Sequence, residues 1–150
     1  MEEGMEKTTL YAYISFIGSE DVDDFPIEVI SERLGIEPTE TWRIGDKVNT
    51  TNTRVRSFTC WKYGSETLET LDSQDVLRPI LDAFNSKIDT INQLKRELNL
   101  HVHIEVVVTI IDGYTPGLVI YPEFSSFAAA IDAYIDIDMY VHPFNESEED

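Results

Sequence analysis

Residues 99–113, NLHVHIEVVVTIIDG, carry the strongest strand signal in a chain of 150 residues. β-Branched side chains dominate this run, and such residues are enriched in strands because they pack well on a pleated, half-buried surface. The turn-forming sequence DGYTPG follows, and residues 117–122, GLVIYP, form a second apolar run. The two runs together predict a β-hairpin.

A long amphipathic helix is predicted just before this hairpin. From Asp75 to Leu98 the apolar residues recur every three or four positions, which is the spacing of one buried helix face. Pro79 is compatible with such a helix only near its first turn, because proline cannot donate the backbone hydrogen bond of a helix interior. The pattern therefore indicates one helix that begins close to residue 75.

The segment after the hairpin predicts a further helix and a last strand. Residues 122–135, PEFSSFAAAIDAYI, place apolar side chains at helical spacing as far as Tyr134. Residues 136–141, DIDMYV, alternate as a strand does. The apolar face of this strand would be formed by Ile137, Met139 and Val141.

The N-terminal part of the chain also alternates between strand and helix signals. Residues 9–17 are rich in aromatic and β-branched residues and end at Gly18, which indicates a strand. Pro26 follows a run of acids and suits a first helical turn, and Gly35 is typical of a helix end. Residues 40–63 indicate two strands joined by the polar loop NTTNT.

These elements follow one another in the order βαββαββαβ, without an internal repeat. The order predicts an α+β fold with a mainly antiparallel sheet that helices cover on one face. We expect one domain over residues 9–143, a flexible N-terminus over residues 1–8 and an acidic, flexible tail over residues 144–150.

The net charge narrows the classes of partner. The chain has 11 Lys and Arg against 29 Asp and Glu, a formal net charge of −18 at pH 7. The resulting field repels phosphate backbones and anionic lipids, so we expect neither nucleic acid nor a membrane surface as a direct partner. It accelerates encounter with a basic protein, although acidity also serves solubility.

Two further features indicate a cytoplasmic protein. No apolar run approaches the roughly 20 residues of a membrane span, and the start, MEEGMEKTT, lacks the basic and then apolar order of a secretory signal.

Cys60 is the single cysteine, so an internal disulfide is impossible. We interpret Cys60 as a small strand residue rather than a reactive thiol.

The sequence contains little that indicates catalysis. No glycine-rich loop has the spacing of a phosphate-binding motif. His101 and His103 share a strand face that Glu105 continues, and three such groups could bind zinc. A polar, half-exposed strand face explains them more simply, and we predict no metal site. Asp136 and Asp138 also share a face and could divide acid and base work, but such pairs arise by chance in an acidic protein.

Residues 37–48, EPTETWRIGDKV, allow a structural and a functional interpretation. In the structural one, Trp42 is buried, Gly45 relieves backbone strain in a turn and Asp46 accepts hydrogen bonds from nearby amides. In the functional one, Trp42 and Arg43, with or without Trp61, lie on an exposed surface as anchors for a partner, because Trp and Arg are enriched among binding hot spots. The sequence favours the structural interpretation.

Three segments, LGIEPTETWRIGD, PGLVIYPE and DIDMY, resemble the bacterial domain-of-unknown-function family numbered 4279. The resemblance spans most of residues 10–141. The family has no assigned activity, so the resemblance implies no chemistry. Some of its members are associated with toxin and immunity systems, which implies a link to immunity. The residues that carry the resemblance are Pro38, Thr39, Trp42, Gly45, Asp46, Asp136, Asp138 and Tyr140.

The sequence thus predicts a non-enzymatic protein-binding domain without a cofactor, and an immunity protein that neutralises a basic toxin is the specific form of this hypothesis. An alternative is a small-ligand-binding protein or enzyme with a pocket that combines Trp42, Arg43 and Asp46 with the Asp136 and Asp138 pair. A third is a module that assembles with itself through a sheet edge. The residues expected to bind a partner are Glu20, Asp21, Asp23, Asp24, Trp42, Arg43 and Asp46.

Overall fold

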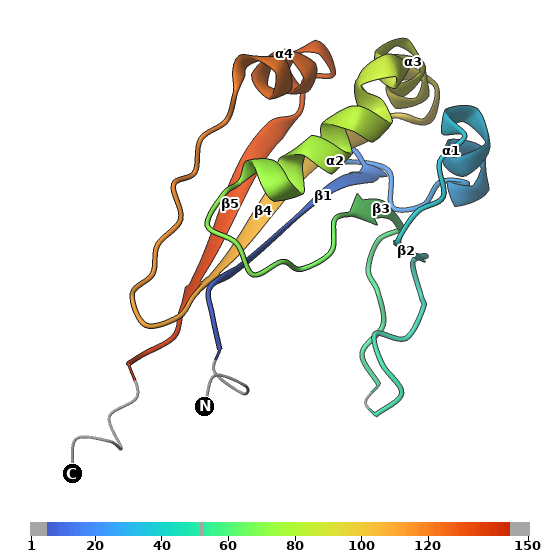
Figure 1. Cartoon of the computed structure of the whole chain (residues 1–150). Coiled ribbons are helices and arrows are strands. Elements are labelled where there is room, and N and C mark those ends of the chain that lie inside the picture. The colour runs from blue at the N-terminus through green and yellow to red at the C-terminus, as the bar shows by residue number, and fades with distance from the viewer. Residues whose placement is uncertain (1–5, 52, 145–150) are drawn as a thin grey trace.

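A computed structural model describes residues 6–51 and 53–144 and shows one five-stranded sheet (Figure 1). In their order across the sheet, the strands are β2 (Glu40–Trp42), β3 (Cys60–Gly64), β1 (Thr9–Gly18), β4 (Leu100–Ile110) and β5 (Tyr134–Val141). Neighbouring strands are antiparallel except for β4 and β5, which are parallel. The predicted α+β class with a mainly antiparallel sheet is confirmed.

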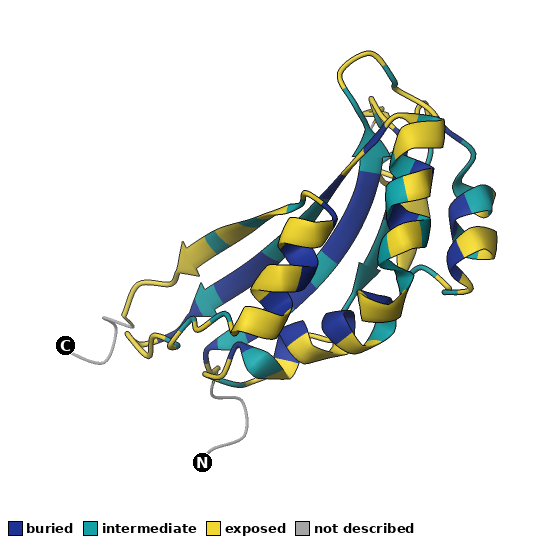
Figure 2. Cartoon of the chain, turned by 90° about the horizontal axis from the view of Figure 1, so that it is seen from above, coloured by how far each residue is buried: buried dark blue, intermediate teal, exposed yellow. Residues whose placement is uncertain are grey.

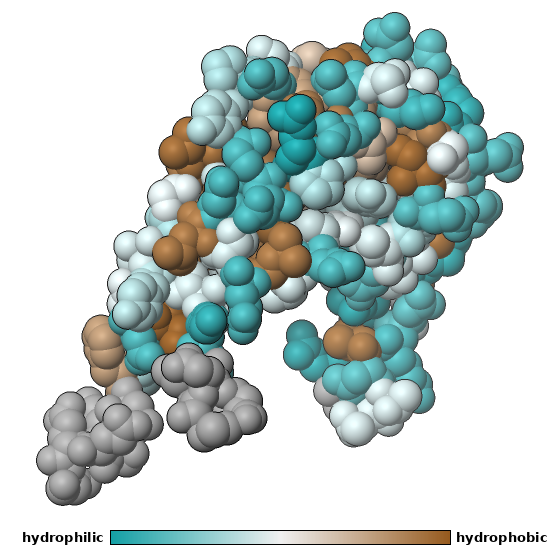
Figure 3. Space-filling view, in the orientation of Figure 1, coloured by the Kyte–Doolittle hydropathy of each residue, from teal (hydrophilic) through white to brown (hydrophobic). Residues whose placement is uncertain are grey.

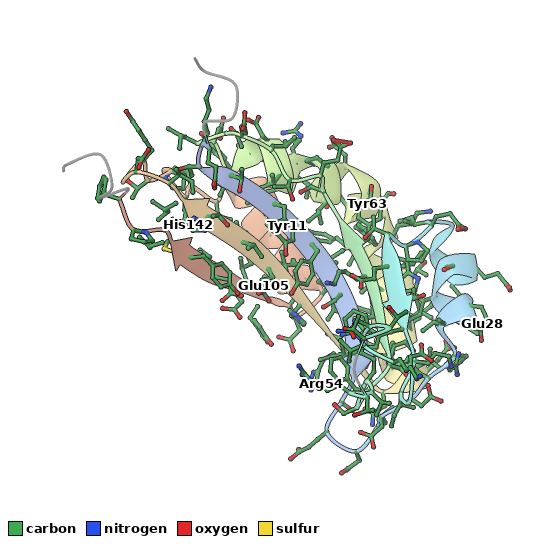
Figure 4. The ribbon with its side chains drawn as sticks, turned by 90° about the horizontal axis from the view of Figure 1, so that it is seen from below. Tyr11, Glu28, Arg54, Tyr63, Glu105 and His142 are labelled. Atoms are coloured by element: carbon green, nitrogen blue, oxygen red, sulfur yellow. The ribbon has the colours of Figure 1, made fainter. Side chains whose placement is uncertain are left out.

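The helices form a single layer above this sheet. They are α1 (Ile27–Leu34), α2 (Gln74–Phe84), the short 3-10 helix η1 (Asn85–Lys87), α3 (Ile88–Leu98) and α4 (Pro122–Ala130). Figures 1 and 2 show α2, α3 and α4 over one face of the sheet, with α1 beside them near β3. The view from below shows the opposite face without a helix (Figure 4). The predicted arrangement, with helices on one face, is therefore correct.

The core lies between the helices and the two central strands. Side chains of a strand alternate between the faces of a sheet, so every second residue of β1 and β4 points toward the helices. Ile14 of β1 lies opposite Ile104 of β4, and both are fully buried. Trp61 of β3 packs edge-to-face against Phe16 and Phe84, with ring centroids 5.3 and 6.2 Å away.

The predicted single helix over residues 75–98 is wrong in one respect, because the structure breaks it into α2, η1 and α3. The break begins at Phe84, whose φ of −112° departs from helical geometry. Both helices bury their apolar side on the core, so the spacing of apolar residues continues across the break and does not reveal it. Pro79 lies inside α2, beyond its first turn, and is exposed.

The predicted hairpin over residues 99–122 is also wrong. β4 forms, but residues 117–121 return as an irregular segment on the helix side instead of a strand, and Pro122 begins α4. Gly117 makes only an isolated bridge to Asp72, and the carbonyl of Val119 accepts a hydrogen bond of 2.7 Å from Ser73 Oγ. The two positions beside β4 are taken by β1 and β5, so no room for a returning strand remains.

Two strand boundaries also differ from the predicted ones. β2 has only three residues, and residues 43–59 form a long loop that projects below the sheet (Figure 1). Within the described part of this loop, an isolated bridge between Lys47 and Val55 and a few backbone hydrogen bonds, such as Val48 N–H to the carbonyl of Arg54 at 3.0 Å, replace the two longer strands that were expected. Tyr134 is the first residue of β5 and is exposed, whereas the sequence predicts it in the preceding helix.

The expected terminal segments fall largely outside the described residues. Residues 1–5 and 145–150 are not described, so the predicted flexibility there stays a prediction. Thr8, inside the expected flexible N-terminus, is buried, and its Oγ1 donates a hydrogen bond of 2.7 Å to the carbonyl of Tyr114. The packed domain therefore includes Thr8.

We expect replacement of Trp61 by alanine to lower the free energy of unfolding by about 3–5 kcal/mol, because a large, fully buried aromatic side chain is lost from the core. The indole Nε1 also loses its hydrogen bond of 2.9 Å to Ser31 Oγ. Urea denaturation measures the change. Trp42→Ala is the matched control. If Trp42→Ala lowered the free energy of unfolding as much as Trp61→Ala does, the assignment of Trp61 to the core would be contradicted.

Candidate functional site

The sheet face without helices, which we call the open face, concentrates aromatic and acidic side chains. The strand registers fix its membership, because residues paired across neighbouring strands point to the same side. Tyr13 of β1 lies beside Glu105 of β4, which lies beside Asp136 of β5. The other aromatic or charged members used below are Tyr11, Glu40, Trp42, Lys62, His101, His103, Tyr134, Asp138 and Tyr140.

Glu105 is the least exposed carboxylate of this face, with a side chain 13% exposed. Its position in the middle of the sheet is visible in Figure 4. Burial raises the pKa of Glu105, and the neighbouring carboxylate of Asp138 raises it further. The cause is that a second negative charge and a partly dry environment both penalise ionisation. A hydrogen bond with Tyr13 acts in the opposite direction but does not cancel these effects, so the open face contains a carboxylate whose ionised form is only partly compensated.

Tyr13 and Lys62 lie next to this carboxylate cluster. Burial and the charge of Glu105 raise the pKa of the Tyr13 phenol, so it stays protonated. Lys62 Nζ lies 4.2 Å from the centre of the Tyr13 ring and 3.4 Å from Oε1 of Glu40. Lys62 is the one Lys or Arg on the open face of the five strands, and its charge is already paired.

His103 contacts residues of both neighbouring strands. Its Nε2 lies 3.1 Å from Ser15 Oγ, and its ring stacks on Tyr134 at 5.5 Å between centroids. Burial lowers the pKa of His103, which favours the uncharged imidazole. Among the described residues, no group of three or more His, Cys, Asp and Glu could hold a metal ion, and His101 is exposed.

The segment around Arg43 forms the base of the projecting loop. The backbone N–H of Arg43 donates to Asp46 Oδ2 at 2.8 Å, and Gly45 adopts the left-handed φ of 92° that this turn requires. Arg43 Nη2 lies 3.3 Å from Asp24 Oδ1, which also accepts a hydrogen bond of 2.6 Å from Thr59 Oγ1. These contacts join two loops and match the structural interpretation of this segment.

Trp42 and Trp61 lie on opposite faces of the sheet, so Trp61 does not join Trp42 and Arg43 in the exposed surface of the functional interpretation. Trp42 is half-buried on the open face, where the guanidinium of Arg56 lies 3.9 Å from its ring centroid. Phe58 packs edge-to-face against the Trp42 ring, with the two centroids 5.7 Å apart. Both come from the projecting loop, which therefore covers Trp42.

The residues of the alternative pocket are not brought together. Trp42 ends β2 at one edge of the sheet, and Asp136 lies on β5 at the other, with three strands between them. In the acidic loop before α1, Asp24 is exposed like its acidic neighbours, but its carboxylate is engaged in hydrogen bonds. Those exposed neighbours are Glu20, Asp21 and Asp23.

Sequence reasoning did not identify the cluster around Glu105 as a candidate binding site. Its members lie far apart in the chain, and only the pairing of β1 with β4 places Tyr13 beside Glu105. The signal that was available is the alternation of Tyr11 and Tyr13 with apolar residues in the first strand.

Cys60 is buried, which raises the pKa of its thiol to about 12 and agrees with an unreactive strand residue.

A family model described as Domain of unknown function (DUF4279) matches residues 7–142. No curated protein and no solved structure matches the chain. Within the described ranges, no helix combines the length and the apolar character that crossing a bilayer demands.

We expect Thr59→Val to destabilise the protein at neutral pH, because Thr59 Oγ1 both donates to Asp24 and accepts the N–H of Ile44 at 3.0 Å. The Thr59 hydrogen bond is the largest cause of the lowered pKa of Asp24, with Arg43 adding to it. A carboxyl group whose pKa is lowered by folding stabilises the folded state at pH values above its ordinary pKa. This stabilisation is lost as the pH falls through the folded-state pKa. Urea denaturation from pH 7 down to pH 2 should therefore show that the wild type has a higher free energy of unfolding than Thr59→Val at neutral pH and that this difference shrinks in acid. Equal stabilities of the two proteins at pH 7 would contradict a structural role for Thr59.

Glu105→Gln should have the opposite sign and stabilise the protein at pH 7. A raised carboxyl pKa means that the folded state binds the proton more tightly, so stability falls as pH rises from the ordinary value through the raised one. The amide retains the shape of the side chain and carries no charge. Thermal unfolding between pH 4 and pH 8 should show a gain at neutral pH that disappears in acid. Asp89→Asn on the exposed side of α3 is the control, and an equal gain in that variant would refute the assignment.

Proposed function

The chain belongs to the DUF4279 family, whose description states no activity, and we propose that it is a non-enzymatic domain that binds a basic protein on the open face. The observation that supports this most strongly is the charge of that face. Four carboxylates lie on the strands there, and the one lysine is already paired with one of them. The carboxylates are Glu40, Glu105, Asp136 and Asp138.

Tyrosine side chains provide the contact area that such a surface needs. Tyr134 and Tyr140 are 65% and 55% exposed, and Tyr11 and Tyr13 are partly exposed. Tyrosine offers a large amphipathic surface at low conformational-entropy cost, which is why binding surfaces are enriched in it. Aromatic rings beside carboxylates suit Lys and Arg side chains, because a cation interacts favourably with both.

The shape of the molecule supports the same proposal. Figure 3 shows the space-filling surface hollowed on its lower side, between the projecting loop and the opposite end of the sheet. The open face forms the roof of this hollow. A convex basic surface fits a concave acidic one, and the exposed Glu20, Asp21 and Asp23 extend the negative field beyond the strands.

A basic toxin is a partner of this chemistry, and the proposal extends to bacterial immunity in the cytoplasm. Enzymes that act on nucleic acid carry positive surfaces for the phosphate backbone. An acidic protein that occupies such a surface blocks access to it, and a net charge of −18 accelerates the encounter. The basic character of the partner is the part of the proposal that the open face supports directly.

The proposal predicts that Asp136→Asn combined with Asp138→Asn weakens capture of a basic protein by the immobilised chain. The control, Glu32→Gln combined with Asp89→Asn, removes the same number of charges from exposed positions on α1 and α3. For the captured protein, we expect the association rate constant to fall about tenfold in the open-face variant and to stay within about twofold of wild type in the control. Surface plasmon resonance at 50 and 150 mM salt measures both.

Two results would contradict this function. One is a captured partner that is acidic. The other is an association rate that falls equally in both double variants, because the open face would then contribute only its share of the total charge.

A further inference from the structure

The free edge of the sheet at β5 is the surface that the proposed function leaves unused. β5 is the last strand in the sheet order. Figures 2 and 4 show no other described segment beside its outer edge. An edge strand presents unpaired N–H and C=O groups, which can hydrogen-bond to a strand of another chain.

The parallel register identifies which backbone groups are free. His142 N donates a hydrogen bond of 3.0 Å to the carbonyl of Ile110, so the backbone groups of His142 point toward β4. Successive residues of a strand direct their backbone groups to opposite sides. The N–H and C=O groups of Ile135, Ile137 and Met139 therefore point outward, away from the sheet.

The β5 edge lacks two of the devices that usually prevent pairing with another chain. Residues 134–141, YIDIDMYV, contain no proline, lysine or arginine, and their only charges are the negative ones of Asp136 and Asp138, which discourage an acidic strand but not a basic one. The opposite edge is protected differently, since β2 has only three residues. A partner strand therefore has only one long edge to join.

The side chains along β5 specify what that strand must carry. Asp136 and Asp138 point to the open face, beside Glu105. Ile137, Met139 and Val141 point to the helix side and are 37, 53 and 68% exposed. A strand that alternates cationic and apolar residues would complement both faces, because residues two apart share a face.

A second copy of this chain fits the edge poorly. Two of the possible two-fold antiparallel registers place like charges opposite one another: pairing centred on Asp138 places that residue opposite its own copy, and pairing centred on Ile137 places Asp136 opposite Asp138. Like charges directly opposite one another are destabilising, and each copy carries a net charge of −18.

We propose that the basic partner adds an extended segment to the β5 edge as a sixth strand. Its Lys or Arg residues lie beside Asp136 and Asp138 on the open face, and its apolar residues lie beside Ile137 and Met139. Backbone hydrogen bonds provide affinity and the alternating side chains provide specificity. This inference rests on the proposed function and names how the same class of partner docks.

The probe is the capped heptapeptide KVKVKVK, compared with KKKKVVV, which has the same composition and charge in blocks. Isothermal titration calorimetry should show the alternating peptide binding at least about tenfold more tightly. Backbone N-methylation of the alternating peptide at every second residue removes the hydrogen bonds on one edge, and we expect it to abolish the difference. Hydrogen exchange should show new protection at the N–H groups of Ile137 and Met139.

Met139→Pro and Met139→Ala form the matched protein variants. Proline removes an outward N–H without removing a hydrogen bond to β4, so the edge strand tolerates it while partner pairing does not. We expect Met139→Pro to lose the preference for the alternating peptide and Met139→Ala to retain it. The N-methylated peptide tests the same hydrogen bonds on the wild-type chain, so the result does not depend on the folding of a variant.

Equal binding of the alternating and block peptides would overturn strand addition and leave the proposed electrostatic docking intact. If the chain prefers the alternating peptide and this preference is unchanged when Asp136→Asn and Asp138→Asn are combined, the result would instead contradict the proposed function. Protection confined to residues outside β5 would overturn the inference, because the added strand would lie elsewhere.

Discussion

The antiparallel pairing of β1 with β4 is the constraint on which the other features of this protein depend. It runs over ten residue pairs from Thr9 to Gly18 and sets which side chain of each strand faces the helices. The rows that contain Ile14 and Ile104 are buried under α2, α3 and α4 and supply the hydrophobic stabilisation. The rows between them carry Tyr13 and Glu105 and face away from the helices. A one-sided core thus determines both the stability of the sheet and the composition of its open face.

The open face combines groups that are unfavourable together in the isolated chain. Glu105 is mostly buried beside Asp138, and the chain as a whole repels itself through its excess of negative charge. A cation placed against these carboxylates removes the repulsion, so the charge that lowers the stability of the free protein contributes to binding. The same reasoning disfavours a second copy at β5 and favours a basic strand there. Charge and edge geometry therefore select the same class of partner.

Local patterns in the sequence were sufficient to predict most of the helices and strands, but they did not predict which strands pair. Alternation predicted β1 and β4, and Gly35 correctly marked the end of α1. The same patterns could not show that α2 ends at Phe84, since the apolar spacing continues through the break. Residues 117–122 satisfy strand preferences, yet β1 and β5 occupy the sites beside β4. Of the candidate binding residues, Asp46 accepts the N–H of Arg43 in a local turn that the sequence predicted, whereas Asp24 contacts Arg43 and Thr59 from another loop. The Glu105 cluster depends on pairing across ninety positions of sequence, which composition does not encode.

The most direct test of the account is whether the open face is in contact with solvent in the free protein. A soluble gadolinium chelate enhances the NMR relaxation of protons that it can approach. The account predicts strong enhancement for the ring protons of Tyr134 and Tyr140, intermediate enhancement for Tyr11 and Tyr13, and little for Trp61, Phe84 and Phe127. Protection of the four tyrosines to the level of Trp61 would contradict it, because the face would then be covered and could not receive a partner.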